Sequence, residues 1–368
     1  MLHARHRNMP HRLVTAFIAT SVFACSSIGP ATVARDRIDY VGSIGNSWKQ
    51  QTLLNIVKLR YGDVPIFLEI TQVVAGYQLE STVGAGFNAS NSNGTVVGPF
   101  TVGGTATAQN TYTDRPTLIY TPLTGVNFLK NLMTPIPPRA VLFLLQSGYP
   151  AELVMRVAVD AINGVNNQSR RGMKRPADPQ FARLVELMRD VQLAGALEVR
   201  IEHPKDGSET SVIIFGPSKN PEIAAESKEI RTILGLEQNV RELNVYYGGY
   251  SGKKNEIDLM TRSMLQIMLE LAAIVQVPES DVARGAAAPG LVDTQAVGTQ
   301  DRLIVKILSG DAAPKDAYVA VKYNGRWFWI AGTDIQSKYT FGFVMLLFSI
   351  SDTGIKGSAP TVTVPVNQ

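Results

Sequence analysis

The sequence predicts an α+β fold that carries a long β-hairpin rich in glycine and threonine. Three observations predict this class. Apolar residues recur with a helical period between Ser43 and Arg60. The uncharged stretch from Ser81 to Thr113 alternates with the two-residue period of β-strands. Helix-like and strand-like segments then mix along residues 123–278, and a chain of 368 residues, 45% of them hydrophobic, can bury a sizeable core.

The N-terminus has the pattern of a secretory signal peptide. Three arginines and no acidic residue precede a short apolar run, Leu13–Ala24. The run is too short for a membrane-spanning helix, which needs about 20 apolar residues. Cys25 follows it and is the only cysteine in the sequence, so intramolecular disulfides and cysteine-rich metal sites are excluded.

The end of this run indicates a lipid anchor. Val22-Phe23-Ala24-Cys25 resembles the bacterial lipoprotein signal, in which the cysteine is lipidated on sulfur and becomes the first residue of the mature chain. The resemblance implies a signal peptide over residues 1–24 and a covalent lipid on Cys25. Because Ser26 follows, it also implies lipid anchoring to the periplasmic face of the outer membrane. An incidental cysteine in an ordinary signal peptide is the alternative.

Removal of this peptide changes the charge balance. The whole chain has a formal net charge of +4 and four histidines, but three arginines and three histidines precede Cys25. The mature chain is therefore nearly neutral, which gives no reason to expect nucleic acid as a partner. One histidine remains, His203, beside a predicted turn. We therefore expect no metal site and no cofactor apart from the lipid on Cys25.

Three longer segments resemble an uncharacterised family of Gram-negative outer-membrane lipoproteins. They are LLNIVKLRY at residues 53–61, KYNGRWFWI at 322–330 and TFGFVMLLFSISDTG at 340–354. The resemblance covers the mature chain. It implies the location and the lipidation, and it assigns no functional residue.

Residues 25–64 are expected to form a lipid tether followed by an amphipathic helix. The helix covers Ser43–Arg60 and is ended by Gly62 and Pro65. Its apolar side is expected either to pack on the domain core or to lie on the inner leaflet of the outer membrane.

Residues 65–122 are expected to form a hairpin region that is uncharged from Ser81 to Thr113. Two alternating runs, Ser81–Ala89 and Thr101–Gln109, flank the turn-forming segment Asn91-Ser92-Asn93-Gly94. Each run has about the 9 to 11 residues of a tilted transmembrane strand. Hairpins from several subunits, each spanning Ser81 to Gln109, could therefore close a shared β-barrel. The alternative is a hairpin that packs on a neighbouring domain or extends into the periplasm.

Residues 123–278 predict an α/β domain. One predicted helix begins after Asp178 as N-cap, with Pro179 at its first position. A methionine stripe on the last predicted helix is expected to be core. The predicted helices are Ala151–Gly164, Pro179–Gly195, Pro221–Leu234 and Asn255–Leu271, and a hairpin is centred on Pro204–Gly207.

The chain ends in a predicted linker, residues 279–301, and a β-rich module, residues 302–368. Asn324-Gly325 is a strong hairpin signal that joins two short strands. A third strand is expected at Leu303–Leu308. The apolar segment Phe341–Ile350 is expected to be a buried strand or a short core helix.

Two sets of residues are candidates for binding. A basic loop could meet phosphates, an acidic partner or peptidoglycan carboxylates, although an ordinary solvated surface is the simpler explanation. An alternating strand places two tryptophans on one face, where they form either core or a partner surface. The residues are Arg170, Arg171, Lys174 and Arg175 in the loop, and Trp327 and Trp329 on the strand.

The sequence contains no catalytic constellation. Ser251-Gly252-Lys253-Lys254 lacks the companion motifs of penicillin-recognising enzymes. Asp352-Thr353-Gly354 would need a second carboxylate, from a homodimer, for aspartic-protease chemistry. We therefore expect a non-enzymatic structural or assembly component of a cell-envelope complex, with protein partners or copies of itself. The alternatives are a subunit of an oligomeric secretion or export channel and an envelope hydrolase.

Overall fold

The described part of the chain is an α+β fold, as predicted. The computed structural model describes residues 30–74, 77–91, 100–114, 117–169, 175–202, 210–287 and 305–351. The predicted signal peptide and Cys25 lie outside these residues. The chain divides into two compact units, which are Met1–Gly45 with Ile70–Thr121, and Asn46–Glu69 with Pro122–Gln368.

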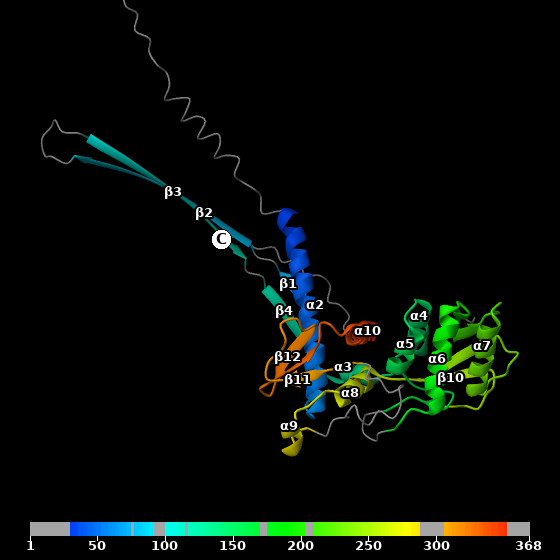
Figure 1. Cartoon of the computed structure of the whole chain (residues 1–368). Helices are drawn as coiled ribbons and strands as arrows, with labels where there is room; N and C mark the ends of the chain where they lie inside the picture. Colours follow the sequence, from blue (N-terminus) through cyan, green and yellow to red (C-terminus); the bar gives the residue numbers. More distant parts are fainter. Residues whose placement is uncertain are drawn as a thin grey trace, which may run out of the picture. The chain divides into compact units, whose positions relative to one another are not determined.

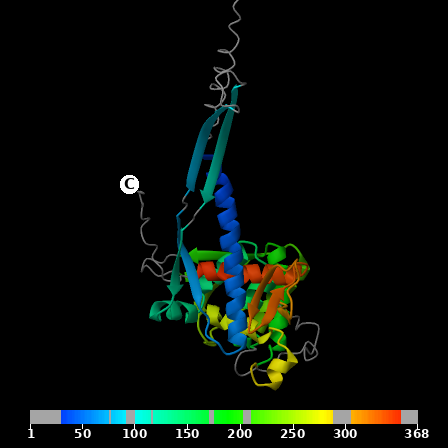
Figure 2. The same cartoon turned by 90° about the vertical axis from the view of Figure 1, so that its left-hand side faces the viewer.

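The smaller unit contains two-stranded sheets. Its longest strands, β2 (Tyr77–Asn91) and β3 (Phe100–Asp114), pair with each other as an antiparallel ribbon (Figures 1 and 2). β1 (Phe67–Val74) pairs with β4 (Thr117–Leu123), and most of both strands belongs to this unit. The helix α2 (Pro30–Arg60) contributes residues to both units.

A six-stranded sheet forms one half of the larger unit. Its order is β6-β5-β10-β9-β8-β7, with β10 and β9 parallel and the other neighbours antiparallel. Helix α4 contacts β7 to β10, while α5, α6 and α7 pack in sequence beside it (Figure 1). The elements are β5 (Val159–Ile162), β6 (Val165–Asn166), β7 (Leu197–Glu202), β8 (Thr210–Phe215), β9 (Glu242–Tyr247), β10 (Glu256–Thr261), α4 (Pro138–Gln146), α5 (Ala151–Ala158), α6 (Pro179–Leu193) and α7 (Pro221–Ile233).

The predicted helix Ala151–Gly164 is wrong in its second half. The helix ends at Ala158, and β5 and β6 then form a hairpin through Asn163 and Gly164. Both turn residues have positive φ, 44° and 82°, which is the conformation that Asn-Gly supplies in a two-residue hairpin turn. The prediction of a continuous helix overlooked this dipeptide signal.

The predicted helix Asn255–Leu271 is wrong in its first half. The segment forms β10 and then a separate helix, α8 (Met264–Ala273). Ser263 and Gln266 make a reciprocal capping box that starts α8, and this box fixes the boundary. Met264 and Met268 are buried as expected, but Met260 lies on the strand and is partly exposed.

The C-terminal part of the larger unit contains a three-stranded antiparallel sheet of order β11-β13-β12. The predicted hairpin at Asn324-Gly325 is confirmed, because both residues have positive φ and join β12 to β13. The apolar segment after it is helical, so the module is not β-rich to its end. The elements are β11 (Leu308–Gly310), β12 (Val319–Tyr323), β13 (Arg326–Ile330) and α10 (Ile335–Ile350).

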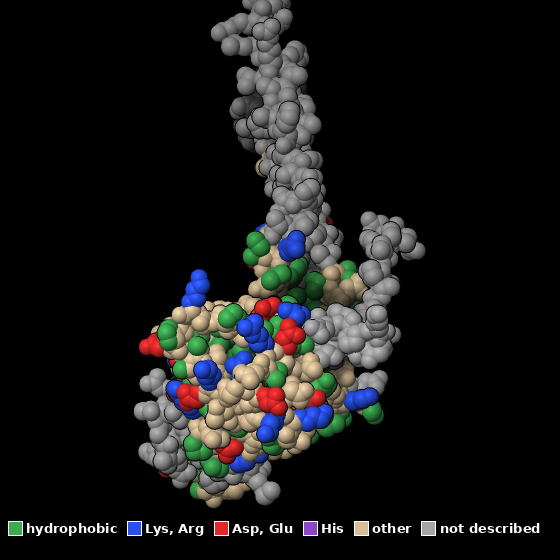
Figure 3. All heavy atoms as spheres, turned by 90° about the vertical axis from the view of Figure 1, so that its right-hand side faces the viewer, with side chains coloured by type: hydrophobic (Ala, Val, Ile, Leu, Met, Phe, Trp, Pro, Cys, Tyr) green, Lys and Arg blue, Asp and Glu red, His purple; other side chains and the backbone are tan. Residues whose placement is uncertain are grey.

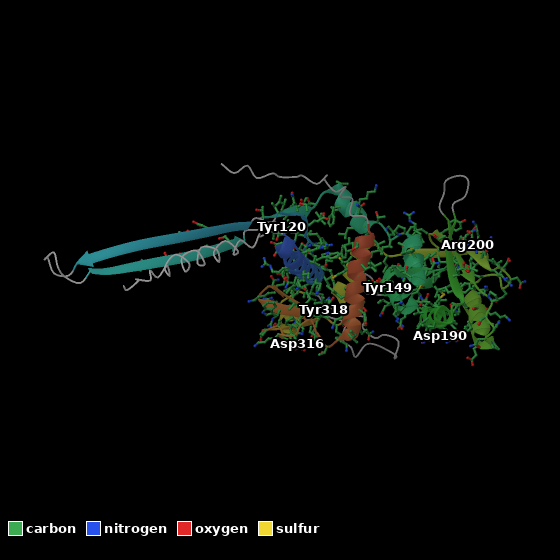
Figure 4. The ribbon with its side chains drawn as sticks, turned by 90° about the horizontal axis from the view of Figure 1, so that it is seen from above. Tyr120, Tyr149, Asp190, Arg200, Asp316 and Tyr318 are labelled. Atoms are coloured by element: carbon green, nitrogen blue, oxygen red, sulfur yellow. The ribbon has the colours of Figure 1, made fainter. Side chains whose placement is uncertain are left out.

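Helix α10 lies at the centre of the core. Its Phe341 ring packs against Tyr318 and its Phe343 ring against Tyr149, with centroid distances of 6.4 and 5.4 Å. Tyr149 and Tyr318 lie on opposite sides of the helix (Figure 4). Phe348 packs on Phe67, 5.4 Å between centroids. Because α10 is covered on several sides, it needs no polar face.

The C-terminal half of α2 also packs into this core. Leu53, Ile56 and Val57 are fully buried, which is what the core-packing alternative expects. Beyond the helix end, the Tyr61 hydroxyl donates to Asp281 Oδ2 (2.5 Å) and so fastens α9 (Glu279–Ala283) beside it. The larger unit is completed by α3 (Val126–Met133). None of the helices in the described ranges combines the length and hydropathy needed to cross a membrane.

Candidate functional site

The β2–β3 ribbon is the most unusual surface of the protein. All 15 residues of β2 pair in continuous register with β3, from Tyr77 opposite Asp114 to Asn91 opposite Phe100. Strands of this length extend roughly 50 Å at ~3.4 Å per residue. From Ser81 to Thr113 the sequence has no charged residue. The ribbon is therefore long and narrow, and its two charged residues, Glu80 and Asp114, lie near the end at which β2 begins.

The pairing register sorts residue types between the two faces of the ribbon. One face carries the cross-strand pairs Val83–Ala108, Ala85–Ala106 and Ala89–Val102. The opposite face carries Thr82–Gln109, Gly84–Thr107 and Gly86–Thr105. A slip of one residue would move one strand's set to the wrong face. The observed register therefore gives the ribbon a less polar face and a polar face.

Glycine and threonine alternate across the strands on the polar face. The hydroxyls of Thr107 and Thr105 donate to the carbonyl oxygens of Gly84 and Gly86, at 3.4 Å each. A Cβ atom at Gly84 would lie 2.8 Å from the Thr107 hydroxyl oxygen. Glycine on β2 thus leaves room for the threonine on β3 to lean across the ribbon.

The outer edges of the ribbon are open to pairing. Among the strands that the structure describes, β2 and β3 pair with each other and with no third strand. A sheet edge presents unpaired N–H and C=O groups, and proteins usually protect it with lysine, proline or a covering element. Neither β2 nor β3 contains lysine or proline. The edges are therefore suited to strand addition.

The edge of β1 is closed by side chains of α2. The Asn55 amide donates to the carbonyl oxygen of Ile66 (2.8 Å) and accepts from its N–H (3.0 Å). One helical turn earlier, the Gln51 amide makes the same pair of bonds to Leu68, at 3.1 and 2.7 Å. Each side-chain amide thus makes the two hydrogen bonds that the backbone of a neighbouring strand would otherwise make. Sequence analysis missed these two residues, whose signal is an amide pair spaced i, i+4 on a helix.

The two predicted tryptophans lie on one face of the three-stranded sheet and are half-buried. The intervening Phe328 and the following Ile330 are buried on the opposite face. A Cβ at Gly310 would be 3.1 Å from the ring of Trp329, so this ring lies over the glycine of the neighbouring strand. Trp329 therefore packs along its own sheet, and Trp327 is paired across the strands with Lys322.

The predicted basic loop lies mostly outside the described residues, which include Arg175 but not Arg170, Arg171 and Lys174. Arg175 Nη2 donates to the carbonyl oxygen of Asn167 (3.2 Å) and lies 3.8 Å from Asp160 Oδ1. The same carboxylate oxygen is 3.4 Å from Nε of the buried Arg262. Arg175 thus belongs to an ion-pair network at the base of the loop.

Charges on the rest of the larger unit are mixed. The face in Figure 3, seen from the right-hand side of Figure 1, intersperses blue and red side chains. Arg183 on α6 makes a bidentate pair with Glu229 on α7, at 2.8 and 2.9 Å. Hydrogen bonds from Arg183 hold the pKa of the Glu229 carboxyl below its usual value. Among the described residues, this face shows no single-sign patch for a polyanion.

The residues considered for catalysis do not form a site in the described ranges. The Ser251 hydroxyl and backbone N–H both donate to Asp258 Oδ2, at 2.7 and 2.6 Å. Asp258 is buried and so holds this loop. His203 and Asp352 lie outside the described residues. Within those residues, no three His, Cys, Asp or Glu side chains cluster in a way that could hold a metal ion.

Comparison of the chain with protein-family models, with curated proteins and with solved structures finds no significant match. The ribbon, with its open edges and two unlike faces, remains the feature with the clearest functional meaning.

Proposed function

We propose that the protein is a non-enzymatic lipoprotein of the outer membrane, anchored through Cys25 on the periplasmic face, that serves as a structural or assembly component of a cell-envelope complex. The β2–β3 ribbon carries this proposal. A two-stranded hairpin is at best marginally stable alone in water. A ribbon of 15-residue strands that is uncharged from Ser81 to Thr113 therefore calls for a partner that pairs with its edges or covers its faces.

Copies of the same chain are the partner that the ribbon suits best. The outer edge of β2 in one copy can pair with the outer edge of β3 in the next, because the two edges are different surfaces. Such head-to-tail contacts generate rings when the rotation closes. A closed ring leaves no strand edge unpaired. Self-assembly would thus satisfy both edges of every ribbon with one type of contact.

A second function is favoured by the sorting of residue types between the faces. In an oligomeric secretion or export channel, the hairpins from Ser81 to Gln109 would form a shared β-barrel. Membrane strands alternate lipid-facing apolar residues with lumen-facing polar residues. The register supports this arrangement, since Val83, Ala85 and Ala106 share one face while Thr105 and Thr107 share the other.

The test of assembly is the size of the full-length protein in detergent, measured by light scattering. We expect a ring-sized particle, and we expect a monomer when β2 and β3 are replaced by a short Gly-Ser turn. Far-ultraviolet circular dichroism and urea unfolding of the shortened chain show whether the larger unit still folds. An intact chain that is monomeric, with its ribbon open to protease in liposomes, would contradict self-assembly.

Two adjacent substitutions separate the channel from a periplasmic scaffold. Ala106→Lys places a charge on the less polar face, and Thr105→Lys places the same charge on the polar face. A lipid-facing lysine near the bilayer midplane costs about 2–4 kcal/mol. In a channel, Ala106→Lys should therefore abolish insertion, while Thr105→Lys should insert and change ion selectivity. Equal assembly of both variants without membrane conductance would support the scaffold.

A further inference from the structure

Helix α3 has two apolar faces, and the fold explains one of them. Phe128 and Leu132 are buried, 8% and 5% exposed, and the Phe128 ring packs 5.8 Å from that of Phe67. The other face carries Val126, Leu129 and Met133, which are 81%, 50% and 55% exposed. Residues spaced i, i+3 and i+7 lie on one side of a helix. We call these three residues the α3 stripe.

A lysine accompanies the α3 stripe. Lys130 is exposed on the same side of the helix, next to Leu129. The sequence contains no acidic residue between Asp114 and Glu152. An exposed apolar stripe accompanied by a lysine, in a segment of the sequence without acidic residues, complements a surface that is both apolar and anionic.

We propose that the α3 stripe is a membrane-docking surface, which inserts at the boundary between headgroups and acyl chains of a leaflet that contains anionic phospholipid. Val126, Leu129 and Met133 would enter the acyl region, and Lys130 would face the phosphates. A protein partner fits less well, because stable interfaces bury about 800 Å² on each side and the stripe is three side chains on a helix of 8 residues. This proposal does not depend on the ribbon.

A fluorescent probe tests the position of the α3 stripe. The full chain carries Cys25→Ser, so that an introduced cysteine is the one labelled and no acyl chain contributes. An environment-sensitive dye is attached at Leu129→Cys or, as a control, at Leu193→Cys on α6, which is 79% exposed. Vesicles contain equal parts of phosphatidylglycerol and phosphatidylcholine. We expect the dye at position 129 to brighten several-fold and to be quenched by doxyl-labelled lipid, and the dye at 193 to stay unchanged.

Variants of the α3 stripe test its contribution to binding. Replacement of Val126, Leu129 and Met133 by serine should lower partitioning onto these vesicles about tenfold, and Leu193→Ser should not. Lys130→Glu should weaken binding to the anionic vesicles and leave binding to phosphatidylcholine alone unchanged. Since all four side chains are exposed, the variants should keep the unfolding midpoint of the parent chain.

Two results would overturn the proposal. The first is a dye at position 129 whose emission and quenching do not differ from those of the dye at 193. The second is a triple-serine variant that changes the oligomeric state in solution while its vesicle partitioning equals that of the parent, which would make the α3 stripe a contact between protein chains.

Discussion

Removal of the Asn55 amide should destabilise the larger unit much more than removal of the Gln51 amide. Each side chain makes the same two hydrogen bonds to one residue, Asn55 to Ile66 just before β1 and Gln51 to Leu68 within it. Asn55 is 1% exposed, whereas the bonds of Gln51 are open to solvent. In Asn55→Ala the N–H and C=O of Ile66 lose their partners in a partly buried position. Each unsatisfied group costs about 1–2 kcal/mol, so the loss should be about 2–4 kcal/mol. In Gln51→Ala water replaces the amide, and the loss should be about 1 kcal/mol or less.

Urea unfolding followed by tryptophan fluorescence measures both losses. The three tryptophans of the chain, Trp48, Trp327 and Trp329, all belong to the larger unit. With an unchanged m-value, the shift of the midpoint multiplied by m gives the change in unfolding free energy. Equal losses in the two variants would refute the reasoning, because burial is the difference between them. Asn55→Asp tests the hydrogen bond that the Asn55 amide donates. The substitution places a carboxylate oxygen, which cannot donate, against the Ile66 carbonyl oxygen, so it should destabilise as much as alanine does.

Three further perturbations probe the C-terminal half of the larger unit and its contact with α2. In Gly332→Ala the new Cβ would overlap the backbone oxygen of Asp316, so the free energy of urea unfolding should fall by about 2 kcal/mol. In Gly342→Ala, within α10, the new Cβ meets nothing within 4 Å, so the free energy of unfolding should rise by about 0.5–1 kcal/mol. Changes of the same sign in the two variants would contradict this reasoning. Asp334 caps α10 by accepting from the Ser337 N–H, so Asp334→Ala should cost about 1 kcal/mol in thermal unfolding and Asp334→Asn should restore most of it. Burial, and then the hydrogen bond to its carboxylate partner, raises the pKa of Tyr61 above its usual value. The stability from this group is therefore present below about pH 10 and lost as the pH rises further. Tyr61→Phe should flatten that alkaline decline in a series of urea titrations, and an unchanged decline would exclude this group as its source.

The value of a local sequence signal depended on its surroundings. Asn324-Gly325 stands between two short alternating segments, and the sequence predicts its hairpin correctly. Asn163-Gly164 carries the same signal, but the apolar segment before it joins the end of α5 to β5 without a polar break, so its period indicates a continuous helix. Ser263 and Gln266 likewise mark a helix start inside a longer apolar pattern. In both cases local turn or cap chemistry decided the boundary against the apolar period.

Burial on several sides explains why the sequence of Phe341–Ile350 could not distinguish a buried strand from a core helix. A segment whose aromatic rings pack against Phe67, Tyr149 and Tyr318 is covered on several sides. It has no polar face, so neither the helical nor the strand period is visible in its sequence. The sequence also does not show which side chains bond to the edge of a strand. Nothing in the spacing of Gln51 and Asn55 indicates that they bond to residues 17 and 11 positions further along the chain. The sequence of α3 is apolar on two faces, and the sequence does not show which face is exposed. The structure shows that Phe128 and Leu132 are the buried pair.

The position of α10 also sets the order in which the protein can fold. Phe348 lies on Phe67, so residues separated by most of the chain meet in the same cluster. Contacts of such long sequence separation slow folding. The core cannot close until residue 350 has been synthesised, and until then the preceding strands and helices lack their central packing partner. The contact between Phe67 and Phe348 therefore forms only when synthesis of the chain is nearly complete.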